Sequence, residues 1–316
     1  MKVLKFIKNW TLPISMIVGA LSYFIYINIP GIEITKPFVN HFISIIQPIL
    51  IFSMLFITFC KISPKELRLC KWHLYLLLFQ TITFTVLGFL LIGFKDLPGK
   101  VLIEGAMLCL ICPTATAAAV ITGKLGGNAA RLTTYTILIN LTSALIIPLL
   151  LPLIHDNHQS FLQAFLTILA KVFPMLFLPF IVAMAVRFFL PGIHRLIIKQ
   201  KDLAFYLWAV ALALAIGTTV KSMMHSQVSI GYQLGIAGIS LACCALQFFL
   251  GKRIGAKFQD EISAGQALGQ KNTVFAIWLG YTFLTPVTSI AGGFYSVWHN
   301  LFNSYQLYKQ RKQNNP

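Results

Sequence analysis

The chain has 316 residues, of which 57% are hydrophobic and 10% charged, and its mean hydropathy is +0.79. Soluble domains are usually about 25% charged, so this composition excludes a soluble protein and indicates many membrane spans. The formal net charge of +17 does not indicate a nucleic-acid partner, because the basic residues gather on alternate loops, as in membrane proteins that keep positive loops inside.

Ten mostly apolar runs, each long enough to cross a lipid bilayer, follow one another along the chain. The first follows three lysines, but it is about 20 residues long and has no small-residue cleavage site, so it predicts a retained helix rather than a signal peptide. The loop charges place both termini in the cytoplasm and predict a multi-pass protein of the inner (plasma) membrane. The runs are 10–29, 38–59, 73–94, 101–123, 130–154, 161–189, 203–224, 229–250, 262–284 and 287–307.

The polar loop 155–160 divides the chain into two sets of five predicted helices, residues 1–154 and 155–316. Because five is odd, the second set must run with inverted topology relative to the first. The sequence therefore predicts an all-α membrane protein built from two inverted five-helix repeats, as in many secondary transporters.

The fourth predicted helix of each set is interrupted near its middle by polar, helix-breaking residues. The interruptions are 112–116 (CPTAT) and 268–273 (LGQKNT). Unpaired backbone groups are costly in lipid, so broken helices persist only where they line a cavity or a binding site. At about 1.5 Å per residue, both breaks fall about 13–17 Å into their segments, near the midplane. We expect the two breaks to cross there.

Four polar side chains, Thr114, Thr116, Asn272 and Thr273, lie where the new half-helices begin. Helix N-termini present free amides and positive dipole ends, which suit a carboxylate or another anion. Capping of the half-helices without contact to any ligand is the alternative, and the two roles are compatible.

Lys271 is the most informative residue, since a charge at mid-membrane costs about 2.5–3.5 kcal/mol even on the lenient insertion scale. We interpret it as part of an anion site; the alternative is a lysine that reaches the cytoplasm or pairs with a core carboxylate. If the ammonium can release its proton, protons become a coupling partner.

Other chemistry is not indicated by the sequence. Cys109 and Cys112 have CxxC spacing but lack flanking His or acidic residues, so they are interpreted as small core residues. No phosphate-binding loop, Ser/His/Asp order or HExxH motif occurs. We therefore expect no enzyme, no cofactor, no metal site and no nucleic-acid partner; the expected partners are a small organic anion and the lipid bilayer.

Several segments resemble the bile acid:sodium symporter family and its bacterial organic-anion relatives, and the resemblance covers essentially the whole chain. They are CPTATAAAVITGKLGG with the following NAARLTTYTILINLTSALIIPLLLP, DEISAGQALGQKNTVFA, SVWHN and QPILIFSMLFITF. The resemblance implies ten helices in two domains. A core contains the crossing broken fourth and ninth helices, and a panel contains the first, second, sixth and seventh.

The chain departs from the family pattern at the sodium sites. In sodium-coupled members the fourth-helix motif ends in Ser-Asn, and the ninth contains Glu-x-Gly-Met-Gln-Asn, which supplies sodium ligands. Here Ala118 and Ala119 stand at the first pair, Ala267 at the carboxylate and Lys271 at the glutamine. The resemblance therefore implies a transporter without sodium coupling, in which the Lys271 ammonium takes the place of a sodium ion.

The resemblance also suggests roles for six more residues. His299 and Asn300 match a polar pair that faces the substrate cavity, although a pair that only bridges helices is the alternative. Gln80 and Thr136 match further sodium-site positions and are expected to bond Lys271 or the unwound backbone. Asn140 and Gln270 are candidates for the same supporting role.

The sequence thus predicts a secondary transporter or facilitator of a small organic anion. An arsenite or oxyanion exporter of the sister family, and a non-transporting membrane sensor on the same fold, are the alternatives. The polar residues at the breaks favour transport over a sensor.

Overall fold

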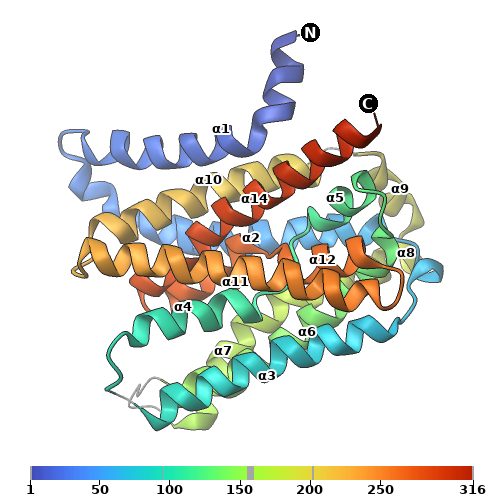
Figure 1. The fold of residues 1–316 in the computed structure, drawn as a ribbon. Helices are drawn as coiled ribbons and strands as arrows, with labels where there is room; N and C mark the ends of the chain where they lie inside the picture. The colour runs from blue at the N-terminus through green and yellow to red at the C-terminus, as the bar shows by residue number, and fades with distance from the viewer. Residues whose placement is uncertain (1, 95, 155–159, 201–202, 315–316) are drawn as a thin grey trace.

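The computed structural model describes residues 2–94, 96–154, 160–200 and 203–314, and all regular elements in this part of the chain are helical (Figure 1). Residues 155–159 of the polar loop predicted to separate the two halves lie outside the described residues, and its last residue, Ser160, is the N-cap of the helix that follows. The elements before it are α1 (Lys2–Ile27), η1 (Ile32–Thr35), α2 (Lys36–Cys60), η2 (Pro64–Glu66), α3 (Lys71–Gly93), α4 (Lys100–Ile111), α5 (Ala118–Lys124) and α6 (Ala129–Ile154).

The regular elements in the described part of the second half are also all helices. Its elements are α7 (Phe161–Leu176), α8 (Leu178–Phe189), α9 (Pro191–Lys199), α10 (Leu203–Met224), α11 (Ile230–Ala256), α12 (Glu261–Gly269), α13 (Thr273–Phe283) and α14 (Pro286–Asn314). The short helix α9 was not among the predicted elements.

Five of the described helices are long and apolar enough to cross a membrane unaided, and a bent pair makes a sixth. They are Ile32–Cys60, Lys71–Gly93, Ala129–Ile154, Leu203–Met224 and Ile230–Ala256. The protein is therefore an all-helical, multi-pass membrane protein. Of the four remaining predicted spans, two are broken, α14 is more polar, and the first contains only the shorter apolar helix Pro13–Ile27, so the count of ten stays a prediction.

The predicted span 161–189 is divided into α7 and α8, which meet at Phe177 with a bend of 42°. Pro174 lies inside α7, and Pro179 lies in the first turn of α8. Proline removes a backbone donor and clashes with the preceding turn, which explains why the helix bends here.

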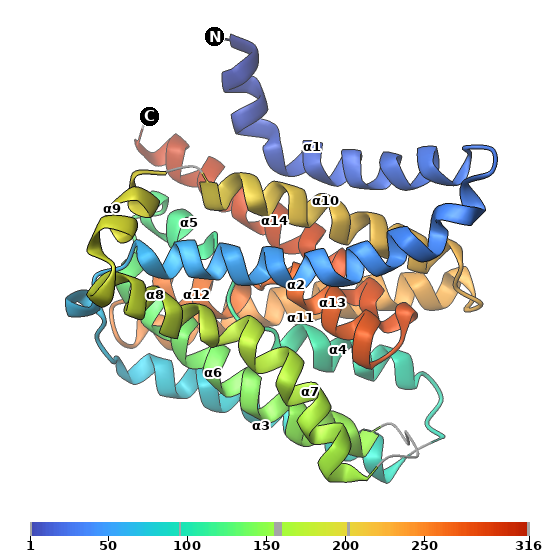
Figure 2. The ribbon, with the colours of Figure 1, turned by 180° about the vertical axis from the view of Figure 1, so that it is seen from behind.

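The helices pack in two groups. α2 packs against α8 and α10, and α1 lies along α10, as Figure 2 shows from behind. At the closest point a Cβ on Gly19 would lie 2.3 Å from the Ala213 carbonyl oxygen, so only glycine permits this approach. In the second group α4 packs on α3, α11 and α14, and α12 packs on α11.

The largest buried apolar cluster joins the two groups. It contains Phe59 from α2, Leu108 from α4, Ala215 from α10 and Phe275 from α13. The two broken helices therefore lie where the second group meets the first, so that residues of both groups can reach the breaks.

Candidate functional site: the paired helix breaks

The two breaks meet through an antiparallel bridge between Thr114 and Lys271. The Ala115 amide donates to the Gln270 carbonyl at 2.9 Å, and the Asn272 amide donates to the Pro113 carbonyl at 2.8 Å. Proline favours an extended residue before it, and Cys112 is extended, with φ −53° and ψ 134°. Each break thus satisfies the backbone groups that the other exposes, which is how non-helical backbone is tolerated at membrane depth.

The carbonyls at the end of α4 accept hydrogen bonds from side chains of other helices. A helix leaves its last four carbonyls without partners. Here the Gln247 amide donates to Cys109 at 3.3 Å and the Ser143 hydroxyl donates to Ile111 at 3.0 Å. The Gln80 amide donates to Leu110 at 2.6 Å and to Cys112 at 3.3 Å. Residues from α3, α6 and α11 therefore fix this end of the first break.

A further bond holds the Gln80 side chain itself. The Tyr135 hydroxyl on α6 donates to its amide oxygen, and both residues are fully buried. This bond sets which end of the amide is the donor, so its nitrogen must point at the α4 carbonyls.

Lys271 places an ammonium at the end of α4. Its side chain is 1% exposed, and Nζ donates to the Leu110 carbonyl at 3.4 Å. Among the described residues no carboxylate forms an ion pair with it. The negative end of the α4 dipole is therefore the contact that favours this charge. Neither alternative for the lysine is seen: it does not reach the surface, and it has no acidic partner in the described part of the chain.

The second break is stabilised at both of its ends. The Thr114 hydroxyl donates to the Ala267 carbonyl at 2.6 Å, and the Tyr295 hydroxyl donates to the Gly269 carbonyl at 2.8 Å. The Asn272 side chain caps α13 by accepting from the Phe275 amide at 3.2 Å, which is the standard N-cap arrangement.

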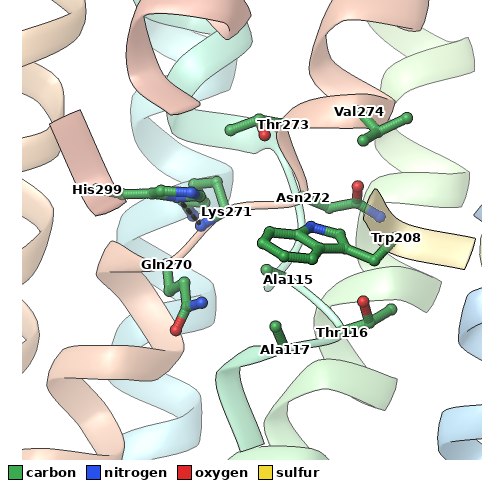
Figure 3. Close-up of a pocket in the computed structure, with 10 residues that line it drawn as sticks. All are labelled: Ala115, Thr116, Ala117, Trp208, Gln270, Lys271, Asn272, Thr273, Val274 and His299. Atoms are coloured by element: carbon green, nitrogen blue, oxygen red, sulfur yellow. Dashed lines mark hydrogen bonds between the residues drawn. The ribbon is translucent and has the colours of Figure 1, made fainter. Parts of the chain in front are cut away.

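A small pocket lies at the crossing (Figure 3). Both breaks contribute to it, together with His299 from α14 and Trp208 from α10. Its enclosed free space is about 10 Å³, room for about one water molecule. In Figure 3 the Trp208 ring lies beside Asn272 and faces the chain at Ala115.

The polar groups around this pocket suit an anion. Because Oδ1 of Asn272 accepts the cap bond from the first turn of α13, the amide nitrogen of the same side chain is left free. This nitrogen is buried and has no hydrogen-bond partner among the described residues. Lys271 adds a positive charge, and none of the described residues that line the pocket is acidic. The His299 Nδ1 accepts from the Lys271 amide at 3.3 Å, so its other ring nitrogen carries the proton.

The structure brings most of the candidate residues together. Thr116, Gln270, Lys271, Asn272, Thr273 and His299 all line the pocket. Thr114 is part of the crossing, but its hydroxyl is occupied by the Ala267 carbonyl.

Three candidates take positions that differ from the expectation. The Asn300 amide donates to Ser296 at 2.6 Å, and the Thr136 hydroxyl donates to Leu132 at 3.1 Å, both inside their own helices. Asn300 is not among the pocket residues, and Thr136 bonds neither Lys271 nor the unwound backbone. Asn140 is 1% exposed, and neither end of its amide has a partner.

Five residues that support or line the site were not singled out by the sequence analysis: Trp208, Tyr135, Ser143, Gln247 and Tyr295. Gln247 had a usable signal, because a glutamine inside an apolar helix requires a polar partner. Trp208 had none, since a tryptophan in an apolar run usually packs against lipid or neighbouring helices.

A sequence model described as the Sodium Bile acid symporter family matches residues 48–229. The match covers more than half of the chain, including the first break and Trp208, and it ends before the second break. None of the curated proteins is similar enough to count as a relative.

Proposed function

The chain belongs to the sodium bile acid symporter family, whose members are membrane transporters, and we propose that it transports a small organic anion without sodium coupling. In this proposal the Lys271 ammonium supplies the positive charge that sodium ions supply in coupled members. The residues that contact the anion are Thr116, Lys271, Asn272, Thr273 and His299.

The observation that carries the proposal is a buried lysine amine, without an acidic partner among the described residues, at a pocket between two broken helices. Ionisable residues inside a membrane protein usually serve function, since their burial is costly. A carboxylate entering this pocket would find the Lys271 charge and the free Asn272 amide. The sign of the charge supports an anion over a cation as the substrate.

The surroundings of the family's sodium positions support the absence of sodium coupling. Hard cations require several oxygen ligands. Ala118 and Ala267 are both fully buried, and their methyl groups cannot coordinate a cation. The Ala267 carbonyl is occupied by the Thr114 hydroxyl, and an ammonium nearby would repel an ion.

The small volume of the pocket bears on the mechanism. An organic anion does not fit into about 10 Å³, so binding requires the pocket to widen, and the proposed movement is a separation of the α10 side, which carries Trp208, from the crossing. Movement of one helical group against the other around a fixed site is the usual basis of alternating access. We propose that α10 with its partners α1, α2 and α8 is the group that moves.

The proposal also includes the setting of the protein. It lies in the inner (plasma) membrane with both termini in the cytoplasm. Its two halves, 1–154 and 155–316, are inverted repeats. Protons are a candidate coupling ion. The loop charges and the polar breaks at matching positions of the two halves support these assignments.

The test is uptake of labelled carboxylates into proteoliposomes, with a sodium gradient and a pH gradient imposed separately. We expect at least one small monocarboxylate or dicarboxylate to accumulate, with the same rate when choline replaces sodium. Arsenite belongs in the same panel, because its transport in place of carboxylates would identify the oxyanion alternative. A protein that moves none of these compounds under any gradient would contradict the proposal and favour the sensor.

A further inference from the structure

A second set of polar side chains, buried or half-buried, lies beyond the pocket, toward the C-terminal end of α14. One face of α14 carries Ser296, His299, Asn303, Gln306 and Gln310. The spacing of three and four residues puts them in one line along the helix. His299 lines the pocket, so this polar face of α14 begins at the crossing.

The far end of this face reaches the loop between α5 and α6. The Gln310 amide nitrogen lies 3.7 Å from the position that a Cβ on Gly126 would occupy. The Arg131 guanidinium of α6 and the Asp260 carboxylate ahead of α12 form an ion pair at 3.2 Å at the same end. Because Lys124, Lys257 and Lys309 are close neighbours of these residues in sequence, we call this the basic end. At about 1.5 Å per residue, His299 and Gln310 are about 16 Å apart along α14.

Polar atoms without hydrogen-bond partners are concentrated along this route. Both amide atoms of Asn303, the amide nitrogen of Gln306 and the hydroxyl of Ser296 are buried without partners. The same holds for both amide atoms of Gln266 on α12 and for the hydroxyl of Thr122 on α5, two half-helices that pack on each other. Asn303 is 4% exposed, Gln266 is 1% exposed and Thr122 is fully buried.

Unpaired buried amides destabilise a fold, and apolar residues of similar size would avoid that penalty. Buried polar groups of this kind are normally paired with protein or water. α14 does have a well-packed apolar side, where Phe302 stacks on Phe248 at 5.3 Å between ring centres. The polar side is therefore a separate feature, and its unpaired groups point to a conformation in which water reaches them.

We infer that the polar face of α14, together with Gln266 and Thr122, forms the aqueous path by which the anion passes between the crossing and the basic end. In the conformation described here the path is closed. When it opens, the amide nitrogens of Asn303, Gln306 and Gln266 donate to the passing anion or to its water. The inference rests on the proposed transport function, but its test does not need the substrate.

The test measures the accessibility of single introduced cysteines to a charged, membrane-impermeant methanethiosulfonate. The reagent is added to either face of membrane vesicles, and peptide mass identifies the modified residue, so that reaction at the native cysteines is counted separately. The variants are Asn303→Cys and Gln306→Cys. Leu301→Cys is the control, because Leu301 is 57% exposed on the outer surface of the helix bundle, where lipid excludes a charged reagent.

We expect Asn303→Cys to react at least tenfold faster than Leu301→Cys, and only from the face at the basic end. Gln306→Cys, one turn closer to that end, should react faster still, and it provides an independent reading if Asn303→Cys does not fold. Rates no higher than that of Leu301→Cys, or reaction only from the opposite face, would overturn the inference. If labelling fails while Lys271-dependent uptake persists, the path is wrong and the transport function stands.

Discussion

At the first break, side chains from α3, α6 and α11 donate to the carbonyls of α4, whereas α5 begins at Ala117 and Ala118 without a side-chain cap. At the second break, Asn272 caps its own half-helix, α13, and the Lys271 Nζ donates to the Leu110 carbonyl at the end of α4. The α4 end of the first break is therefore held by side chains of other helices, and the second break supplies most of the polar residues that line the pocket, Gln270, Lys271, Asn272 and Thr273. The two breaks lie at matching positions in the sequence, but the first depends more on bonds from other helices and the second contributes more of the polar side chains at the pocket.

The largest effect is expected from Lys271→Met, which keeps the side-chain length and removes the charge. Uptake of a carboxylate should fall by more than about tenfold, equivalent to over about 1.4 kcal/mol. The protein should remain folded, because Gln80 still donates to the Leu110 carbonyl. The measurement is initial uptake in proteoliposomes, with a melting curve to establish folding.

Lys171→Met is the matched control for that variant. Lys171 also lies in an apolar helix, but it is exposed on α7, with Nζ 5.5 Å from the centre of the Phe283 ring. Its loss should leave uptake within about twofold of the parent, which corresponds to about 0.4 kcal/mol. Equal losses in the two variants would mean that Lys271 has no special role.

The next largest effect concerns the support of the first break. Gln80→Leu removes the donor to two carbonyls and leaves the Tyr135 hydroxyl without its acceptor. Each unpaired buried group costs about 1–3 kcal/mol, so the apparent melting temperature should fall clearly. Thr136→Val is the control, since that hydroxyl bonds only within its own helix. A larger loss in Thr136→Val than in Gln80→Leu would contradict the assigned support.

A smaller effect is expected at the second break, where Asn272→Ala removes the cap of α13. Loss of an N-cap costs about 1 kcal/mol, and the pocket also loses its free amide donor, so stability and uptake should both decline. Asn300→Ala removes an amide that bonds only its own helix and should change neither appreciably. If the two variants behaved alike, Asn272 would have neither the capping role nor the binding role.

The breaks themselves were predictable from sequence, because CPTAT and LGQKNT combine polar and helix-breaking residues within apolar runs. The meeting of the two segments followed from their matching depth. Their partners were harder to predict: the resemblance placed Gln80 at the unwound backbone, but Ser143 and Gln247 come from two further helices, and only packing decides which side chains reach the α4 carbonyls. The hydrogen-bond partners of Thr136 and Asn300 differ from the family-based expectation. Each side chain donates to a carbonyl one turn earlier in its own helix, and a resemblance in sequence does not reveal such a local bond.

The long spans were also predictable from hydropathy, but the division of 161–189 was not. Pro174 and Pro179 are both visible in the sequence, yet proline is tolerated in many membrane helices. Whether such a helix bends depends on what packs beside it. The position of Trp208 could not be predicted from the sequence for the same reason, because its place at the pocket depends on how α10 is oriented against the crossing.

The most direct test of the central claim is the sodium dependence of uptake at fixed pH and ionic strength. If the Lys271 ammonium replaces the coupling ion, exchanging sodium for choline should leave the uptake rate of a transported carboxylate unchanged. Lys271→Gln, tested alongside, should transport poorly in both salts, because its amide lacks the charge and Ala267 cannot supply the missing carboxylate. A steep rise of wild-type uptake with sodium concentration would contradict the account.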